Sequence, residues 1–293
     1  MHRFFLCVFA LCTCCIPKND DKPFDYGIVV GRVKDKSLYE SSGLASSIKN
    51  PGLLWTHNDS GDKPRLFLVD TLGRMRTTLW LVNAGHKDWE DIAIGSGPED
   101  DESYLYVGDV GDNRVKRAHK TIYRLPEPAS YDAPSTSIEK FDSIRFVLEG
   151  QQKDTEAMIV DPLTKNIYLF SKRGRSTVYK LSYPQMTQGV DTARIVGRLP
   201  FTTVTAADIS TSGKEVLIKT YSAVYYWKRV GDQLIEELLQ SKHLALPYEP
   251  EEQGEAITFK YDGSGYYTST EVAKGENVPL RFYPRKKESE SVK

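Results

Sequence analysis

Cysteine is missing from almost the whole chain. The four cysteines of the 293-residue sequence all stand within its first fifteen residues, at Cys7, Cys12, Cys14 and Cys15. The remainder therefore has no structural disulfide, no thiolate nucleophile and no cysteine-ligated zinc site. A protein without these cross-links must be held together by packing, by bound ions or by closure of its fold.

The sequence also lacks an excess of either charge. Its 39 Lys and Arg residues nearly equal its 40 Asp and Glu residues, so it offers no reason to expect the basic face that nucleic-acid binding needs. The apolar run at residues 4–11 is too short to span a bilayer. Hydrophobic residues make up 40% of the chain, which is enough to bury a sizeable core. We expect no nucleic-acid partner.

The first residues have the form of an export signal. His2 and Arg3 precede the apolar run and small residues follow it, as in a secretory signal peptide. The segment Leu11-Cys12-Thr13-Cys14 resembles a bacterial lipobox, whose cysteine is lipidated and becomes the new N-terminus. Lipidation at Cys15, or an ordinary signal peptide with chance cysteines, is the alternative. We predict a lipoprotein signal at 1–14 with Cys14 lipidated, a flexible tether at 15–25, and anchoring in the bacterial outer membrane or at the cell surface.

The rest of the chain repeats one pattern of short strands. A motif best seen in Asp88-Trp89-Glu90-Asp91 opens each repeat, and strands separated by Gly- or Pro-containing turns follow it. The repeats are spaced at roughly the 45 residues of one four-stranded propeller blade. The fourth repeat is expected to end in a strand at 234–238, and the longer second repeat to carry a loop insertion at 126–134.

The number of repeats predicts the architecture. Five repeats, with an unassigned strand at 27–33 before them, indicate an all-β, five-bladed β-propeller over residues 26–284. The N-terminal strand would complete the last blade and close the ring, which removes free sheet edges. Six blades are the alternative. Residues 285–293 are expected to form a polar tail.

One column of the repeats would line the central channel, because the first strand of each propeller blade faces it. The aligned residues are Ser42, Glu90, Glu156, Ala207 and Glu255. Three converging carboxylates repel one another unless a cation offsets them, and calcium prefers several oxygen ligands in a flexible cage. Ser42 would add a hydroxyl and Ala207 only its carbonyl, while Asp91 and Asp208 could stand in or hold waters. We predict Ca²⁺ at this ring; a water-filled channel without metal is the alternative.

This ring resembles that of the calcium-activated nucleotidases (soluble apyrases), five-bladed propellers whose channel calcium is held by one Ser or Glu per blade. Four of the five positions match, and Ala207 departs from the pattern where that family has a second serine. The resemblance implies a calcium-dependent hydrolase of phosphoesters or phosphoanhydrides. The residues of the repeats are more similar to those of bacterial lipoprotein propellers with HNDSGD and GDxGDN signatures, from which no activity can be carried over.

A second column of polar residues follows the second strands and should lie at the same mouth. We predict that His57 or Asp59 is the catalytic base of a hydrolase. The predicted ligand contacts are Asp62, Asp109, Asp112, Asn113, Lys172, Arg173, Lys219, Tyr221 and Glu271. The cations among them would neutralise a phosphate or carboxylate. The alternative is structural, because Asn, Asp and Gly in these stretches suit tight turns.

Two functions follow from this pattern. The first is a non-enzymatic ligand-binding or scaffold protein of the cell envelope, with a small anionic ligand or an envelope partner. The second is the calcium-dependent hydrolase, and a glycan-processing enzyme is a further possibility on such a fold. We expect a monomer that is attached to the membrane through its N-terminal lipid.

Overall fold

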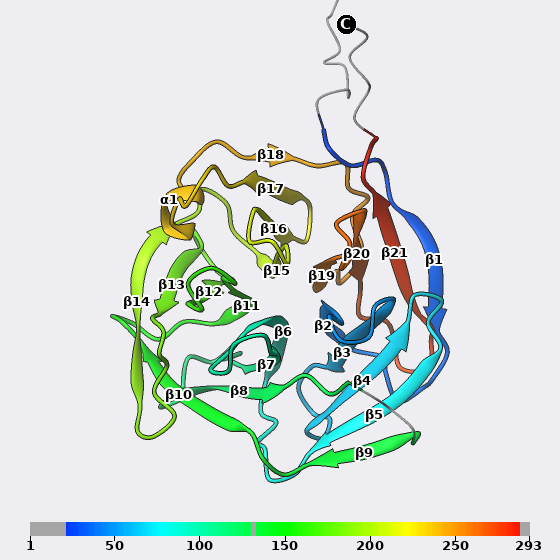
Figure 1. Ribbon diagram of the computed structural model, residues 1–293, viewed down its shortest axis with the longest axis horizontal. Coiled ribbons are helices and arrows are strands. Elements are labelled where there is room, and N and C mark those ends of the chain that lie inside the picture. The colour runs from blue at the N-terminus through cyan, green and yellow to red at the C-terminus, as the bar shows by residue number, and fades with distance from the viewer. Residues whose placement is uncertain (1–21, 130–132, 288–293) are drawn as a thin grey trace, which may run out of the picture.

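Short β-strands surround a common centre (Figure 1). The computed structural model describes residues 22–129 and 133–287 of the chain. Nearly all regular structure within these residues is β-strand, and their only helix is α1 (Ile235–Leu238). No helix in this part of the chain has the length and apolarity to cross a bilayer. The chain is therefore an all-β, β-propeller-like fold.

The described strands form four sheets. One has the order β2 (Ser41–Ser46), β3 (Leu53–Asn58), β4 (Arg65–Asp70), β5 (Met75–Leu81), β9 (Ser135–Ile138). The largest has the order β11 (Thr155–Val160), β12 (Ile167–Ser171), β13 (Thr177–Leu181), β14 (Asp191–Arg198), β10 (Asp142–Leu148), β8 (Lys120–Pro126), β7 (Ser103–Asp109), β6 (Trp89–Ser96). A third has the order β15 (Val204–Ile209), β16 (Glu215–Thr220), β17 (Val224–Lys228), β18 (Leu244–Ala245). The last has the order β1 (Ile28–Val33), β21 (Val278–Pro284), β20 (Gly265–Ser269), β19 (Ala256–Phe259).

Two parallel pairings join the outer parts of the fold. β10 pairs with β14, which merges β6, β7, β8 and β10 with β11 to β14 into one eight-stranded sheet. β9 pairs with β5 and begins directly after the insertion predicted at 126–134. Figure 1 shows β9 on the outer side of its sheet, away from the centre. The segment that follows the predicted insertion therefore adds an outer strand to this sheet.

The inner strands build the channel wall. β2, β6, β11, β15 and β19 contact one another in cyclic order, and β19 contacts β2 to complete the circle (Figure 1). Every residue of β2, β11, β15 and β19 is buried. Large apolar side chains fill the space between neighbouring sheets, and Trp55, Trp89 and Trp227 are fully buried there. The starts of these inner strands therefore have fixed positions around one mouth.

The two ends of the described chain meet at the rim. β1 pairs antiparallel with β21, and Phe24 forms a further bridge with Arg285. The Phe24 ring is fully buried, 5.0 Å from the ring of Tyr266 and 4.5 Å from the guanidinium carbon of Arg285. Arg285 also forms an ion pair of 2.8 Å with Glu215. The fold thus includes Phe24 and Arg285, which the sequence placed in the tether and the tail, because aromatic packing holds both.

The prediction of a strand at 234–238 is wrong. This segment forms α1, and the outer strand of its sheet is β18. Ile235 and Leu238 are buried three residues apart, a helical spacing, and the Glu237 carboxylate accepts a hydrogen bond of 3.3 Å from the Leu234 amide. The periodicity of the apolar residues in this short segment is therefore helical.

Candidate functional site

Acidic side chains from several sheets meet at one mouth of the channel. We call this group the acidic chamber; it comprises Asp59, Asp88, Glu90, Asp154, Glu156, Glu255 and Glu271. Their carboxylates form three overlapping sets, each with oxygens within 4.8 Å of one another: Asp59, Asp88 and Glu90; Asp59, Glu255 and Glu271; Glu90, Asp154 and Glu156. The three glutamates of the predicted ring all belong to the chamber, and so do Asp59 and Glu271 from the second column.

The chamber shields its carboxylates from water. Glu90, Glu156 and Glu255 are 3%, 1% and 5% exposed. Burial, reinforced by the nearby Glu156, raises the pKa of Glu90 well above its usual range. Burial also raises the pKa of Asp59 to about 7 and the pKa of Glu271 to about 9. Ionising the whole group is therefore costly unless positive charge enters the chamber.

Several oxygens of the chamber accept no hydrogen bond from the described residues. They are Asp59 Oδ1, Asp154 Oδ2, Glu156 Oε1 and Glu271 Oε1. Asp154 Oδ2 has only a loose ion pair with Arg173, whose Nε lies 3.9 Å away. Buried carboxylate oxygens normally have donors, and a set of such oxygens is the environment that a hard divalent cation prefers. The donor set of the chamber thus fits a bound cation.

Lys172 introduces one positive charge among these carboxylates. Its Nζ lies 2.8 Å from Glu156 Oε2 and 3.5 Å from Glu255 Oε1. Tyr221 donates its hydroxyl to the same Glu255 oxygen, and its ring centroid lies 5.5 Å from the ammonium. Burial alone would lower the pKa of Lys172, but Glu156 and Glu255 outweigh it and raise this pKa. Lys172 and Tyr221 therefore face the ring carboxylates, and neither is free for an anionic ligand.

The two remaining members of the predicted ring carry no carboxylate. Ser42 donates its hydroxyl to the backbone oxygen of Glu90, at 3.1 Å. Ala207 is 2% exposed and packs in an apolar cluster. The carboxylates of the ring therefore come from three of its five predicted positions.

Asp91 and Asp208 do not stand in for the missing ligands. Asp91 Oδ2 on β6 accepts a hydrogen bond of 2.8 Å from the Met158 amide on β11. Asp208 Oδ2 on β15 accepts one of 2.6 Å from the Phe259 amide on β19. Each of these carboxylates connects neighbouring inner strands, so their role in this structure is to hold the channel wall together.

The two alternatives for the catalytic base, His57 and Asp59, lie in different surroundings. Asp59 belongs to the chamber, whereas His57 is 0% exposed and lies outside its three carboxylate sets. The Nδ1 of His57 lies 3.0 Å from the Asn58 backbone oxygen, and its ring centroid lies 5.7 Å from that of Trp89. Burial lowers the pKa of His57 to about 4. His57 is therefore a neutral, packed imidazole at pH 7, a poor position for a base that must reach substrate.

The acidic turns are largely self-contained. Asp62 accepts hydrogen bonds from the Asn58 side chain at 2.7 Å and from Arg65 at 2.8 and 2.9 Å. These bonds outweigh burial and lower the pKa of Asp62. The Asn58 oxygen in turn accepts from the Tyr39 and Glu40 amides. This part of the second column serves as a structural turn.

The Gly-Asp-Val-Gly-Asp-Asn stretch behaves in the same way. Asp109 accepts a hydrogen bond of 2.8 Å from Arg117, and Asp112 accepts bonds from the amides of Lys116 and Arg117. Asn113 accepts one of 2.9 Å from the largely exposed Arg173 side chain. These predicted ligand contacts are therefore engaged within their own loop or with its neighbour.

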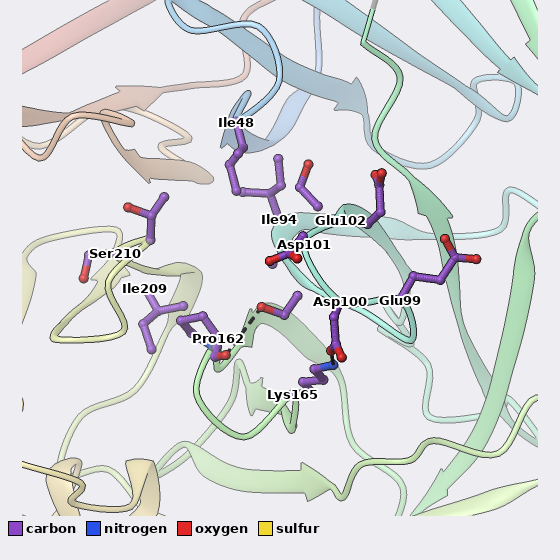
Figure 2. A pocket seen from close by; sticks show the side chains of 14 residues that line it. Ile48, Ile94, Glu99, Asp100, Asp101, Glu102, Pro162, Lys165, Ile209 and Ser210 are labelled. Atoms are coloured by element: carbon purple, nitrogen blue, oxygen red, sulfur yellow. Dashed lines mark hydrogen bonds and ion pairs between the residues drawn. The ribbon is translucent and has the colours of Figure 1, made fainter.

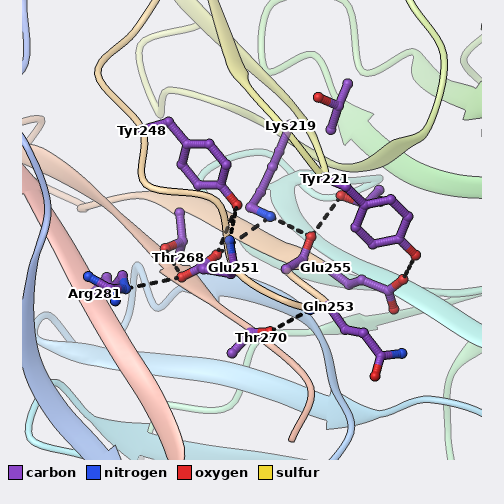
Figure 3. A network of polar contacts seen from close by, with 12 residues as sticks. Lys219, Tyr221, Tyr248, Glu251, Gln253, Glu255, Thr268, Thr270 and Arg281 are labelled. Atoms are coloured by element: carbon purple, nitrogen blue, oxygen red, sulfur yellow. Dashed lines mark hydrogen bonds and ion pairs between the residues drawn. The ribbon is translucent and has the colours of Figure 1, made fainter.

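Lys219 is buried beside the loop that carries Glu255 (Figure 3). It is 0% exposed, donates to the Gly254 backbone oxygen and lies 3.5 Å from Glu251 Oε2. Glu251 also accepts a hydrogen bond of 2.8 Å from Thr268. Burial lowers the pKa of Lys219 to about 8. The lysine thus fixes the loop that presents Glu255, and its ammonium does not face the open mouth.

Asp88 and Asp154 are chamber members that the column alignment missed. Each stands two residues before a ring glutamate, Glu90 or Glu156. Each lies one residue before an inner strand, β6 or β11, and its carboxylate joins the same set as that glutamate. Glu40 has the same relation to Ser42, and its Oε2 also lacks a hydrogen-bond partner within the described residues. A search for acidic residues at this spacing would have found all three.

The opposite mouth holds a cavity of about 290 Å³ (Figure 2). Its apolar lining includes Ile48, Ile94 and Ile209, from the far ends of inner strands or just beyond them. The acidic turn at 99–102 and Lys165 form another part of its lining, and Lys165 pairs with Asp100 at 2.9 Å. No residue that the sequence singled out for chemistry lines this cavity. The sequence prediction therefore concerns the acidic mouth alone.

Comparison with known proteins gives a structural likeness only. No family model and no curated protein matches the chain. Among solved structures, one that matches is titled "Structure of U3-55K", with 12% sequence identity and a TM-score of 0.42 over 83% of this chain and 67% of that chain.

Proposed function

We propose that this chain is a five-bladed β-propeller of the cell envelope that holds a calcium ion in the acidic chamber and presents that mouth to a ligand or partner. The observation that carries the proposal is the set of buried carboxylate oxygens that receive no donor from residues 22–129 and 133–287, above all Glu156 Oε1 and Asp154 Oδ2. The cyclic order of the five inner strands supports the blade number. On this view the eight-stranded sheet is two blades joined through β10 and β14.

Calcium suits the chemistry of the donors. The chamber contains carboxylates from Asp and Glu only. Zinc favours nitrogen and sulfur ligands in tetrahedral sites, whereas calcium accepts about six to eight oxygens in a flexible arrangement. Glu90, Asp154 and Glu156 would hold the ion, because this set is buried and contains two of the unpartnered oxygens. The bound ion would neutralise carboxylates that otherwise repel one another.

A binding or scaffold role is supported by how the other polar groups are used. Lys172 and Lys219 are engaged by glutamates, and His57 is buried. They are three of the five groups expected to grip an anion or activate water, the others being Arg173 and Asp59. With the lysines occupied and His57 packed away, a chamber that binds calcium and contacts a partner through its rim fits the geometry better than a hydrolase.

One observation favours the hydrolase as a second candidate. Asp59 lies in the chamber beside the other carboxylates, and burial raises its pKa to about 7. A carboxylate with a pKa near the working pH is suited to general-base catalysis. Incubating the protein with phosphoester and phosphoanhydride substrates and calcium tests this role. Release of phosphate that is lost in Asp59→Asn would favour the enzyme.

We further propose that Cys14, which lies outside the described residues, carries the lipid that anchors the protein in the outer membrane or at the cell surface. The Leu11-Cys12-Thr13-Cys14 motif and the likeness to bacterial lipoprotein propellers support this. Figure 1 shows the first and last described segments side by side at the rim. An anchored monomer would therefore leave both mouths of the channel accessible.

Thermal unfolding with and without calcium tests the proposed ion. The full chain in detergent is unfolded in EDTA and then with calcium added. A ligand that binds only the folded state at about 100 times its dissociation constant adds about 2.7 kcal/mol of stability. We expect Glu156→Gln to abolish this gain and the exposed Glu276→Gln to retain it. Absence of any shift at millimolar calcium would remove the calcium site and leave a water-filled channel.

A further inference from the structure

Lys172 pairs with two carboxylates of the acidic chamber that come from different inner strands. Its ammonium sits between Glu156 Oε2, at 2.8 Å, and Glu255 Oε1, at 3.5 Å. Glu156 comes from β11 and Glu255 from the segment just before β19. The β15 start lies between these strands in the circle and contributes Ala207, which has no charge. The ring position between Glu156 and Glu255 is thus an alanine with no polar side chain, and Lys172 supplies a positive charge on this side of the ring.

Lys172 contacts one carboxylate in each of two sets that share no residue, and the third set, Asp59, Asp88 and Glu90, overlaps both. Glu90, Asp154 and Glu156 are one set, and Asp59, Glu255 and Glu271 are another. Each set has oxygens without a hydrogen-bond partner in the described part of the chain: Glu156 Oε1 and Asp154 Oδ2 in the first, Asp59 Oδ1 and Glu271 Oε1 in the second. Glu156 therefore gives one oxygen to Lys172 and keeps the other unpaired. Among the described residues, Lys172 is the cation that pairs with both Glu156 of the first set and Glu255 of the second.

We propose that Lys172 is a built-in counter-ion that limits the chamber to one divalent cation, bound by Glu90, Asp154 and Glu156, and keeps the set formed by Asp59, Glu255 and Glu271 from binding a second. This inference rests on the calcium site proposed above. It makes Lys172 the residue that determines cation stoichiometry and affinity, a role different from the anion-binding role that its charge suggested.

The electrostatics of a buried site support this role. An ammonium beside Glu255 offsets charge that a second cation would otherwise find there, and it repels any cation approaching within a few ångströms. Water screens this repulsion weakly, because only 18% of the Lys172 side chain and 6% of the Glu255 side chain are exposed. Removing the ammonium while keeping the length of the side chain should therefore tighten calcium binding and open the second set.

Calorimetric titration with calcium chloride measures both the number of calcium ions bound per chain and the affinity for them. The full chain in detergent, freed of metal, is compared with Lys172→Met and with the control Lys153→Met. Lys153 precedes Asp154 and donates to Thr177 at 2.9 Å, so the control removes the same charge nearby without touching a chamber carboxylate. We expect one calcium per chain in the native protein and in Lys153→Met. Lys172→Met should bind two, the first at least about tenfold more tightly.

The remaining variants separate the outcomes. Lys172→Arg keeps the charge and should keep one calcium per chain, and Lys172→Gln replaces Lys172→Met if the latter does not fold. One calcium in Lys172→Met with affinity within about threefold of the native protein overturns the inference and leaves the calcium site intact. Binding in Lys172→Met but not in the native protein overturns the proposed function and upholds the counter-ion. No binding in either protein overturns both.

Discussion

The two ends of β11 show how differently the fold treats buried carboxylates at the two mouths of the channel. Glu156, at its start, is 1% exposed and leaves Oε1 without a hydrogen-bond donor in the described residues. Asp161, directly after its end, is 0% exposed and accepts two hydrogen bonds from Arg229, at 2.9 and 3.0 Å. Thr164 adds a third, at 2.8 Å. The two carboxylates are buried to nearly the same extent, but the protein provides more hydrogen-bond donors to Asp161 than to Glu156.

Other acidic groups near the second mouth also have hydrogen-bond or ion-pair partners, as Asp161 does. Glu127 accepts hydrogen bonds from Ser103 at 2.7 Å and from Trp55 at 3.1 Å, and Asp100 pairs with Lys165. These carboxylates are satisfied by the protein itself. The comparison teaches that acidity alone does not mark a cation site. A cation site is marked by buried carboxylate oxygens that receive no hydrogen-bond donor from the described residues, and the acidic chamber has several.

Breaking the paired carboxylate at the second mouth should have the largest effect on stability. Arg229→Met leaves Asp161 buried without its bidentate partner, which typically costs about 3–5 kcal/mol. Urea unfolding measures the loss, and the calcium response should survive because the chamber is untouched. The double variant Arg229→Met with Asp161→Leu should recover much of the stability. A single-variant loss below about 1 kcal/mol would show that the pair does not stabilise the fold.

The unpaired carboxylates should make the metal-free protein sensitive to pH. In unfolded chains Asp and Glu lose their protons near pH 4, whereas burial raises the pKa of Asp59 to about 7 and of Glu271 to about 9. Between these values the folded state binds more protons than the unfolded state, so stability should fall as pH rises. Urea unfolding in EDTA at several pH values measures this slope.

Calcium and a matched variant sharpen the pH comparison. Burial also raises the pKa of the proposed ligands Glu90 and Glu156. Because the ion replaces protons on its ligands, added calcium should remove their part of the slope, leave the part due to Asp59 and Glu271, and bind more tightly as pH rises. Glu271→Gln should remove part of the slope above the pKa of Asp59. Stability that is constant from acid to mildly alkaline pH in EDTA would contradict the unpaired state of the chamber.

The smallest effect is expected at the exposed pair of the second mouth. The Asp100 side chain is 90% exposed, and Lys165 lowers its pKa through a hydrogen bond. Water screens such a pair, so it contributes little. We expect Asp100→Asn to unfold at the same urea concentration as the native protein and to respond to calcium unchanged. A clear loss of stability would mean that this turn does more than line the cavity.

Much of the local structure could be predicted from the repeats. Alternating apolar residues and turn signals located the strands, and the aligned glutamates indicated the mouth where charge gathers. The alignment missed Asp88 and Asp154 because it took one residue per repeat and left out the acidic residue two positions earlier. It misjudged the segment of α1 because a short apolar run does not separate helix from strand.

The partners of individual side chains were beyond the reach of the pattern. Asp91 and Asp208 belong to the acidic motif, yet they hold neighbouring inner strands together. His57 lies within a conspicuous polar stretch, yet packing against Trp89 removes it from the chamber. In both cases the decisive contact is made with a residue from another strand.

The sequence by itself determined the all-β, repeating design and brought acidic residues to the starts of the inner strands, because side-chain alternation and turn chemistry are local properties. Only the tertiary structure decided which carboxylates receive a donor. Arg229 reaches Asp161 and Lys172 reaches Glu255 across segments far apart in the chain. Hydrogen bonds and ion pairs act over a few ångströms, and closure of the ring sets which distant segments come that close.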